Sequence, residues 1–187
     1  RSLNTLGIEY ILSKRPEELK NCKKLIFPGV GDAAYAMEQL KKTGFDDFLK
    51  SWAFAGKPLL GICLGSQIIF DFSEEGNTPC LGLIKGKICH FENLLSDENK
   101  KIMKVPHMGW NDLYILKNVP ENSDFYFVHS YVICPENESV IKAVANYGIE
   151  VPAVVESGSI VACQFHPEKS GEVGLRILKN FCGGTSC

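Results

Sequence analysis

The sequence has no strong charge of either sign and no long apolar run. Its 20 basic and 22 acidic residues give a formal net charge of −2, so nothing indicates a nucleic acid or an anionic membrane as partner. Apolar runs stay well below the roughly eighteen residues of a membrane-spanning helix. Repeats and low-complexity linkers are also missing. We therefore expect a single domain over residues 1–187.

Zinc-type cysteine spacing is absent as well. None of the eight cysteines forms the closely paired motifs of a structural zinc site. Several, such as Cys89 and Cys163, lie inside apolar strand-like runs. This pattern favours reduced, mostly buried thiols over disulfides, and hence a cytoplasmic protein. No metal and no cofactor is expected.

The first half of the chain alternates strand and helix patterns. Asp32 is a candidate N-cap for the first of the main helices, and Gly56 and Pro58 stop the second. Such alternation is typical of an α/β protein with a parallel sheet. The expected elements are strands at 24–27 and 59–63 and helices at 33–40, 45–54 and 64–70.

The second half contains closely spaced strand patterns, which favour an antiparallel section or extension of the sheet. The expected elements are strands at 125–128, 141–145, 153–155 and 160–165 and a helix at 172–181. At the front, residues 1–7 are typical of the end of a helix and residues 8–12 of a strand. A sheet of this kind normally begins with an earlier buried strand, which we expect to be missing from this sequence.

Cys63 is the strongest candidate for a catalytic residue. It ends the apolar run at 59–62, precedes a helical pattern and has Gly61 and Gly65 two residues away on either side. This is the pattern of a nucleophile elbow, in which glycines permit a sharp strand-to-helix turn that exposes the nucleophile. The alternative is a buried structural cysteine.

A nucleophilic thiol needs a base, and the base needs an orienting group. His166 and Glu168 stand two residues apart around Pro167, so an extended segment places both side chains on the same side. A surface loop is the alternative. His107 and His129 have no carboxylate at comparable spacing and are expected to have structural roles.

Acyl transfer also needs backbone N–H donors for an oxyanion. The N–H of Leu64, directly after Cys63, is one candidate. The loop at 28–31, which includes Val30 and Gly31, follows another strand, and its glycines allow a peptide N–H to turn toward the site or away from it. As a phosphate-binding loop it lacks the required Lys-Ser/Thr.

Together these segments resemble the class I glutamine amidotransferases, and more narrowly the glutaminase subunits of imidazole glycerol phosphate synthases. The class is marked by Gly-Ile-Cys-Leu-Gly-Ser-Gln at 61–67 and Gln-Phe-His-Pro-Glu-Lys-Ser at 164–170. The narrower group is indicated by the motifs at 28–31, 106–111 and 127–131. The resemblance runs from residue 3 to residue 181 and implies a three-layer, flavodoxin-like α/β fold with a central, mostly parallel sheet.

The resemblance also implies a chemistry. Cys63 attacks the side-chain amide of L-glutamine to form a γ-glutamyl thioester, and His166, oriented by Glu168, transfers the protons. Leu64 and the Val30–Gly31 peptide form the oxyanion hole. Further residues bind the substrate: Gln67 and Glu75 hold its α-carboxylate and α-amino ends, and Gly31 and Ser130 line the pocket.

The implied partner is a (β/α)₈-barrel cyclase of histidine biosynthesis, which receives the ammonia within a heterodimer. Trp110 and Lys169 lie near the interface in this reading. The residues alone leave other readings open. They favour a solvated Glu74–Glu75 pair over a substrate-binding Glu75, and Trp110 suits a core as well as an interface. Ser66 also departs from the methionine that the family often has.

Three rival functions remain at this stage. A similar amidotransferase subunit could feed ammonia to a different synthase, for instance one that modifies a surface sugar. A cysteine hydrolase or peptidase of related fold is disfavoured by Gln67 and Glu75. A non-catalytic binding subunit is disfavoured by the intact set of Cys63, His166 and Glu168.

Overall fold

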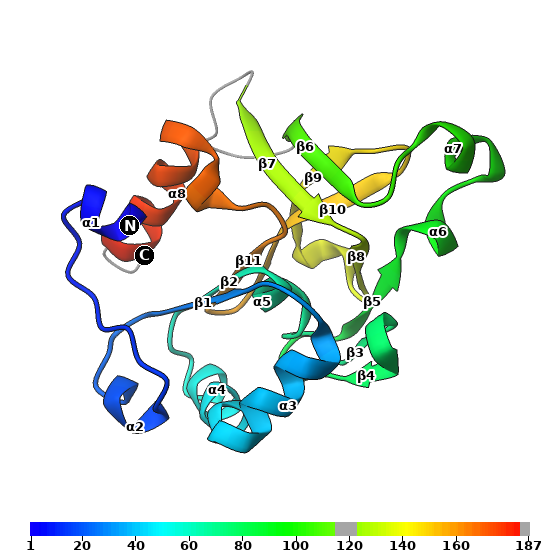
Figure 1. Ribbon diagram of the computed structural model, residues 1–187. Helices are drawn as coiled ribbons and strands as arrows, with labels where there is room; N and C mark the ends of the chain where they lie inside the picture. Colours follow the sequence, from blue (N-terminus) through cyan, green and yellow to red (C-terminus); the bar gives the residue numbers. More distant parts are fainter. Residues whose placement is uncertain (115–122, 184–187) are drawn as a thin grey trace.

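The computed structural model describes residues 1–114 and 123–183. Its largest sheet consists of β1 (Leu25–Gly29), β2 (Leu59–Cys63), β9 (Ile141–Asn146), β10 (Glu150–Ser157) and β11 (Ile160–Cys163). The strand order is β1-β2-β11-β10-β9 (Figure 1). β1 and β11 run parallel to β2, whereas β10 is antiparallel to both β11 and β9. The prediction of a parallel sheet with an antiparallel section is therefore confirmed.

Helices cover both faces of this sheet and give three layers (Figure 1). Along β2, Leu59 packs in the core on one face, while Leu60 and Ile62 pack with Leu178 in the core on the other. Successive strand side chains point to opposite faces, so burial on both sides explains why β2 is a continuous apolar run. Each buried leucine contributes roughly 2 kcal/mol to folding. The covering helices are α3 (Ala33–Thr43) and α4 (Phe45–Phe54) on one face and α8 (Gly171–Gly183) on the other.

The boundaries of α3 and α4 follow from local chemistry. The Asp32 carboxylate accepts a hydrogen bond from the Tyr35 N–H at 2.8 Å, which confirms the predicted N-cap. Gly44 ends α3 with φ 72° and at the same time precedes α4. This left-handed conformation carries little steric cost for glycine. The sheet edge that holds the site is therefore flanked by well-terminated helices.

The described residues also form two smaller sheets, in the orders β4-β3-β5-β8 and β6-β7. The strand predicted at 125–128 lies in the second of these, paired with its neighbour rather than extending the main sheet. The strands are β3 (Phe72–Ser73), β4 (Thr78–Pro79), β5 (Gly86–His90), β6 (His107–Asp112), β7 (Asp124–His129) and β8 (Tyr131–Pro135). Short helices between these strands are η1 (Glu75–Asn77), α6 (Phe91–Leu94) and α7 (Asp97–Ile102), and η2 (Glu138–Val140) follows β8.

Two expected elements differ in the structure. Residues 8–12 follow α1 (Ser2–Thr5) but form no strand. A strand needs a neighbour for its backbone hydrogen bonds, and in the described part of the chain none pairs with this segment, whose Leu12 is 90% exposed. The helix predicted at 64–70 ends early, because α5 spans only Leu64–Gln67.

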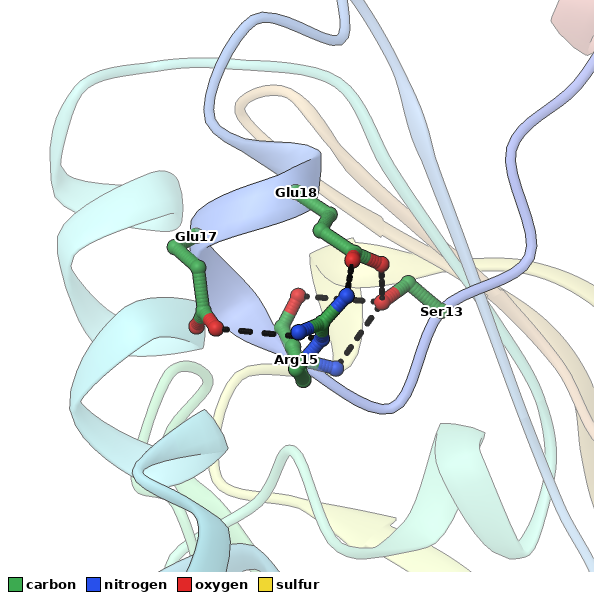
Figure 2. A network of polar contacts seen from close by, with 4 residues as sticks. All are labelled: Ser13, Arg15, Glu17 and Glu18. Carbon is green, nitrogen blue, oxygen red and sulfur yellow. Dashed lines mark hydrogen bonds and ion pairs between the residues drawn. The ribbon is translucent and has the colours of Figure 1, made fainter.

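The short helix α2 (Pro16–Leu19) begins in a small polar network (Figure 2). The Arg15 guanidinium and the Ser13 hydroxyl both donate hydrogen bonds to the Glu18 carboxylate. Glu17 lies 3.9 Å from the Arg15 guanidinium. Because Arg15 and Glu17 are largely exposed, each ion pair contributes about 1 kcal/mol or less. The network fixes the start of α2 rather than stabilising the core.

The cysteines of the described segments are free. Cys63, Cys89 and Cys163 are buried, and the others are partly buried. The eighth, Cys187, lies outside the described residues. Within residues 1–114 and 123–183, no helix combines the length and the apolarity needed to cross a membrane.

Candidate active site

Cys63 stands at the turn where β2 ends and α5 begins. Its backbone has φ 53° and ψ −114°, a region that non-glycine residues rarely adopt. Strain of this kind persists only where surrounding structure enforces it, and it concentrates at functional sites. The turn gives Cys63 the geometry of an elbow, and the residue lines a cavity although its side chain is largely buried.

The glycines on either side of Cys63 provide space rather than unusual dihedral angles. Neither Gly61 nor Gly65 has a positive φ. A Cβ on Gly65 would lie 2.0 Å from the carbonyl oxygen of Phe27 in β1, and a Cβ on Gly61 would lie 2.9 Å from the Gly65 oxygen. The short helix α5 therefore approaches β1 and β2 more closely than a side chain at Gly61 or Gly65 would permit. The change of direction between β2 and α5 is made by the unusual backbone angles of Cys63.

His166 lies between β11 and η3 (Pro167–Lys169), with its ring buried. Its Nδ1 is 2.7 Å from the Oε1 of Glu168. The predicted pairing is present, but the segment is not extended as expected, because Glu168 lies within the 3-10 turn η3. Its Nε2 is buried and has no hydrogen bond of normal geometry, although the Cys63 thiol is close enough to be the main influence on the pKa of the ring. The Sγ of Cys63 instead contacts the Val128 carbonyl oxygen at 4.0 Å. The ring therefore has one nitrogen oriented and the other free to exchange a proton.

The charges of these groups reinforce one another. Cys63 is the largest cause, and Glu168 the next, of a rise in the pKa of His166 to about 9, which burial opposes. For Glu168, burial raises the pKa, but the hydrogen bond to His166 and the nearby positive charges outweigh it, so the pKa is lowered. A protonated His166 imidazolium beside the Glu168 carboxylate is thus favoured at neutral pH.

Ser170 also fixes His166, a role that no pattern in the sequence indicates. Its hydroxyl donates to the His166 carbonyl oxygen at 2.7 Å and accepts from the Tyr126 N–H at 3.0 Å. The His166 N–H in turn donates to the Tyr126 carbonyl oxygen. Ser170 falls within the motif at 164–170, but its partner Tyr126 is far away in sequence, so the motif alone could not reveal the contact.

A cavity of about 310 Å³ brings most of the predicted site residues together. Glu168 is linked to it through His166. Residues not assigned to the site from the sequence also line it, among them His129 and Tyr131. The predicted residues on its wall are Val30, Gly31, Cys63, Leu64, Gln67, Glu75, Ser130 and His166.

The loop before α3 meets this cavity with an unusual backbone. Gly31 has φ 100°, and a Cβ there would have no heavy atom within 4 Å. The Val30 side chain is 79% exposed. The Val30–Gly31 peptide therefore borders the cavity without side-chain packing that would hold it in one orientation.

Gln67 and Glu75 both line the cavity and are each held by hydrogen bonds. The Gln67 Nε2 donates to the Tyr131 carbonyl oxygen at 3.0 Å and to the Gln164 Oε1 at 2.9 Å. Glu75 accepts from the Ala33 N–H at 2.8 Å, and burial, reinforced by Asp32, raises its pKa. Glu75 is thus half-buried on the cavity wall, and the reading of a solvated surface pair does not describe it.

Trp110 and Lys169 lie outside the cavity, on one surface. The Trp110 ring is 58% exposed and packs edge-on against Tyr126 at 5.9 Å, while the Lys169 ammonium is 5.5 Å from the Tyr126 ring centre. We call Trp110, Tyr126 and Lys169 the Trp110 surface. The core alternative for Trp110 is wrong; Trp52, 3% exposed, is a core tryptophan.

This fold and this arrangement of residues define a class. The family model described as glutamine amidotransferase class-I matches residues 2–183, so the chain belongs to the class I glutamine amidotransferases. The expected resemblance to this family and its fold is thereby confirmed.

The curated relatives are more specific. The chain is 47% identical to the imidazole glycerol phosphate synthase subunit HisH of Geobacillus sp. (strain WCH70), over 97% of this chain and 88% of that protein. It is 44% identical to the subunit of the same name from Nitratidesulfovibrio vulgaris (strain DP4), over 97% and 87%. The expected resemblance to this group of subunits is therefore confirmed.

Solved structures support the fold. A crystal structure of a glutamine amidotransferase matches with a TM-score of 0.75 and 22% identity, covering 97% of this chain and 90% of the other. The structure of PurLQS from Thermotoga maritima matches with a TM-score of 0.67 and 18% identity, covering 97% and 89%. At such low identities the likeness concerns the fold alone.

Proposed function

We propose that this chain is the glutaminase subunit of an imidazole glycerol phosphate synthase, acting as one glutaminase domain that supplies ammonia for histidine biosynthesis. One observation carries the proposal: Cys63 and His166 share a cavity with Gly31, Leu64, Gln67 and Glu75. A cysteine hydrolase would need the first pair, but it has no use for the half-buried carboxylate of Glu75. Relatives at 44–47% identity bear the name of this subunit.

In the first half of the reaction, the Cys63 thiolate attacks the side-chain carbonyl carbon of glutamine. The oxygen becomes an oxyanion that accepts hydrogen bonds from the Leu64 N–H and from the Val30–Gly31 peptide. The His166 imidazolium gives its Nε2 proton to the amide nitrogen, the C–N bond breaks, and ammonia leaves. The unpartnered state of Nε2 supports this role.

In the second half, water hydrolyses the γ-glutamyl thioester. Neutral His166 takes a proton from the water, whose oxygen bonds to the carbonyl carbon, and the C–S bond breaks to release glutamate and restore the thiolate. Glu168 keeps the ring oriented and stabilises the imidazolium in both halves. The reaction consumes glutamine and water and needs no metal or cofactor.

The substrate is held at its α-carbon end by the remaining cavity residues. The Glu75 carboxylate attracts the α-ammonium group, and Gln67 lies at the same end. Gly31 and the backbone around Ser130 line the pocket. The partner is a (β/α)₈-barrel cyclase that receives ammonia in a cytoplasmic heterodimer with lyase activity, and the Trp110 surface is the proposed contact.

The test compares glutamine with free ammonia as nitrogen source in the assembled synthase. Cys63→Ala is expected to abolish glutamine-dependent turnover and to leave ammonia-dependent turnover intact, because only the glutaminase step uses the thiol. Cys134→Ala, at a half-buried cysteine that does not line the cavity, is the matched control and should retain both activities.

Loss of both activities, or of neither, in Cys63→Ala would contradict the proposal. A glutamine-analogue electrophile gives a second measurement, since it should label Cys63 and no other cysteine. The ammonia acceptor is tested by mixing the chain with each candidate synthase. Glutamine-dependent turnover with the cyclase, and none with another ammonia-dependent synthase such as a surface-sugar enzyme, would support the proposed acceptor.

A further inference from the structure

A line of buried hydrogen bonds runs from β6 to the substrate cavity, and the proposed mechanism does not use it. His107 and His129 are cross-strand partners in β6 and β7, with the Nδ1 of His107 3.1 Å from the Nε2 of His129. The Nδ1 of His129 lies 2.7 Å from the Tyr131 carbonyl oxygen. That oxygen also accepts from the Gln67 Nε2 at 3.0 Å.

The chemistry of these groups fixes every proton in the line. A carbonyl oxygen can only accept, so the His129 Nδ1 carries a hydrogen. In a neutral ring, Nε2 is then the acceptor, and His107 must donate from its own Nδ1. Burial lowers the pKa of His107 to about 4 and that of His129 to about 3, so both rings are neutral near pH 7.

The same reasoning fixes the side-chain amide of Gln67. Its nitrogen donates to two acceptors, the Tyr131 carbonyl oxygen and the Gln164 Oε1, so both of its hydrogens are used. No described residue donates to the Gln67 Oε1, and Gln67 lines the cavity. The group that Gln67 has left for a ligand is therefore a hydrogen-bond acceptor.

We propose that His107 and His129 are positioning residues that hold the Gln67 amide with its carbonyl oxygen available to the substrate. The inference rests on the proposed glutaminase function and makes it more specific. An acceptor oxygen suits the α-ammonium group of glutamine rather than its α-carboxylate, so it joins the Glu75 carboxylate at that end of the substrate. Gln67 is thus assigned to the α-ammonium group of glutamine, rather than to the α-carboxylate expected from the sequence.

The line is also buried where an ordinary core would be apolar. His129 and Gln164 are 6% and 0% exposed, and the Gln164 Nε2 has no hydrogen-bond partner in the described structure. Leaving a buried amide donor unsatisfied costs free energy. The Gln164 amide cannot be reversed to satisfy it, because its Oε1 is needed by Gln67. The unsatisfied Gln164 Nε2 is therefore consistent with selection for the orientation of Gln67.

The experiment measures KM and kcat for glutamine in the complex with the cyclase. His129→Leu removes the donor to Tyr131 and is expected to raise KM about fivefold with kcat changed less than twofold. His129→Asn keeps an N–H near the position of Nδ1 and should restore KM to within about twofold of the wild type. Tyr147→Phe, which removes a hydrogen bond to the Lys104 carbonyl oxygen from a ring stacked on His107, is the matched control and should leave KM unchanged.

A double-mutant cycle separates positioning from general stability. If His129 acts through Gln67, His129→Leu should raise KM no further in a Gln67→Ala background. Additive effects, or an unchanged KM in His129→Leu, would overturn the inference while the wild type still hydrolyses glutamine. An inactive wild type would instead overturn the proposed function together with the inference.

A spectroscopic measurement serves if His129→Leu does not fold. The ¹⁵N NMR shifts of the wild-type imidazoles should show His129 protonated at Nδ1 alone and His107 protonated at the Nδ1 that donates to His129. His129 protonated at Nε2 would overturn the inference.

Discussion

At the scale of single residues, the properties of His166 depend on what lies at each ring nitrogen. Glu168 holds Nδ1 at 2.7 Å, while Nε2 has no hydrogen-bond partner among the described residues. Burial alone would lower the pKa of His166, because it favours the neutral form of the ring over the imidazolium. The neighbouring thiol and carboxylate reverse that preference. The ring therefore enters the reaction as an acid, although it must act as a base later.

A titration can test this account. Cys63→Ala removes the largest cause of the raised pKa of His166, so the pKa is expected to fall from about 9 toward the usual value for histidine. NMR of the His166 imidazole across pH gives the value directly. Cys89→Ala, at a buried cysteine that does not line the cavity, should leave the titration unchanged. An identical pKa in wild type and Cys63→Ala would show that the thiol does not control the ring.

At the scale of elements, the active-site turn is determined by how closely α5 approaches β1. The oxygen of Phe27 occupies the space that a side chain on Gly65 would need. The approach fixes where the Leu64 N–H lies relative to Cys63, and that N–H is a proposed oxyanion donor. The glycine therefore links packing of the sheet to catalysis.

Gly65→Ala tests this link. Its Cβ would lie 2.0 Å from the Phe27 oxygen, so the backbone must shift, and we expect the free energy of unfolding to fall by about 3 kcal/mol or more. Glutaminase activity should fall with it, even where the variant remains folded. Urea unfolding of the variant and of Gly183→Ala gives the comparison, because a Cβ on Gly183 meets no heavy atom within 4 Å. Equal stability of the two variants would contradict the packing argument.

Elements whose signals are local could be predicted from the sequence. The cap at Asp32, the end of α4 before Gly56 and Pro58, and the apolar run of β2 each depend on neighbouring residues, and the structure contains them all. The strand expected at 8–12 failed because a strand also depends on a partner, which the sequence of the segment does not specify. The same limit explains why β7 pairs with β6 instead of extending the main sheet.

The candidate site divides in the same way. Cys63, His166 and Glu168 lie in two short motifs, so their proximity within each motif could be predicted. Ser170 and His129 act through Tyr126 and Tyr131, contacts that exist only in the folded chain. The half-burial of Glu75 beside Ala33 likewise depends on how η1 (Glu75–Asn77) meets α3.

At the scale of the whole molecule, the proposed site is incomplete until the loop before α3 takes one orientation. Val30 is 79% exposed and Gly31 has φ 100°, so little in the described chain holds the Val30–Gly31 peptide. We expect the isolated chain to hydrolyse glutamine at least about tenfold more slowly than the complex, which corresponds to about 1.4 kcal/mol. Titrating the cyclase into a glutaminase assay measures this. Full activity without the partner would refute control by the loop.

The Trp110 surface provides the last prediction. Trp110 is 58% exposed although tryptophan buries a large apolar area when it can, and Tyr126 and Lys169 adjoin it. Exposed aromatic residues of this kind are typical anchors of protein interfaces. Trp110→Ala should weaken binding of the cyclase by about 2 kcal/mol, or roughly 30-fold in Kd, and leave folding unchanged. Phe54→Ala is the matched control, because Phe54 is 96% exposed on α4, which covers a face of the main sheet opposite α8. Calorimetric titration of both variants decides the matter: equal affinities would place the interface elsewhere, whereas a loss confined to Trp110→Ala would assign it to this surface.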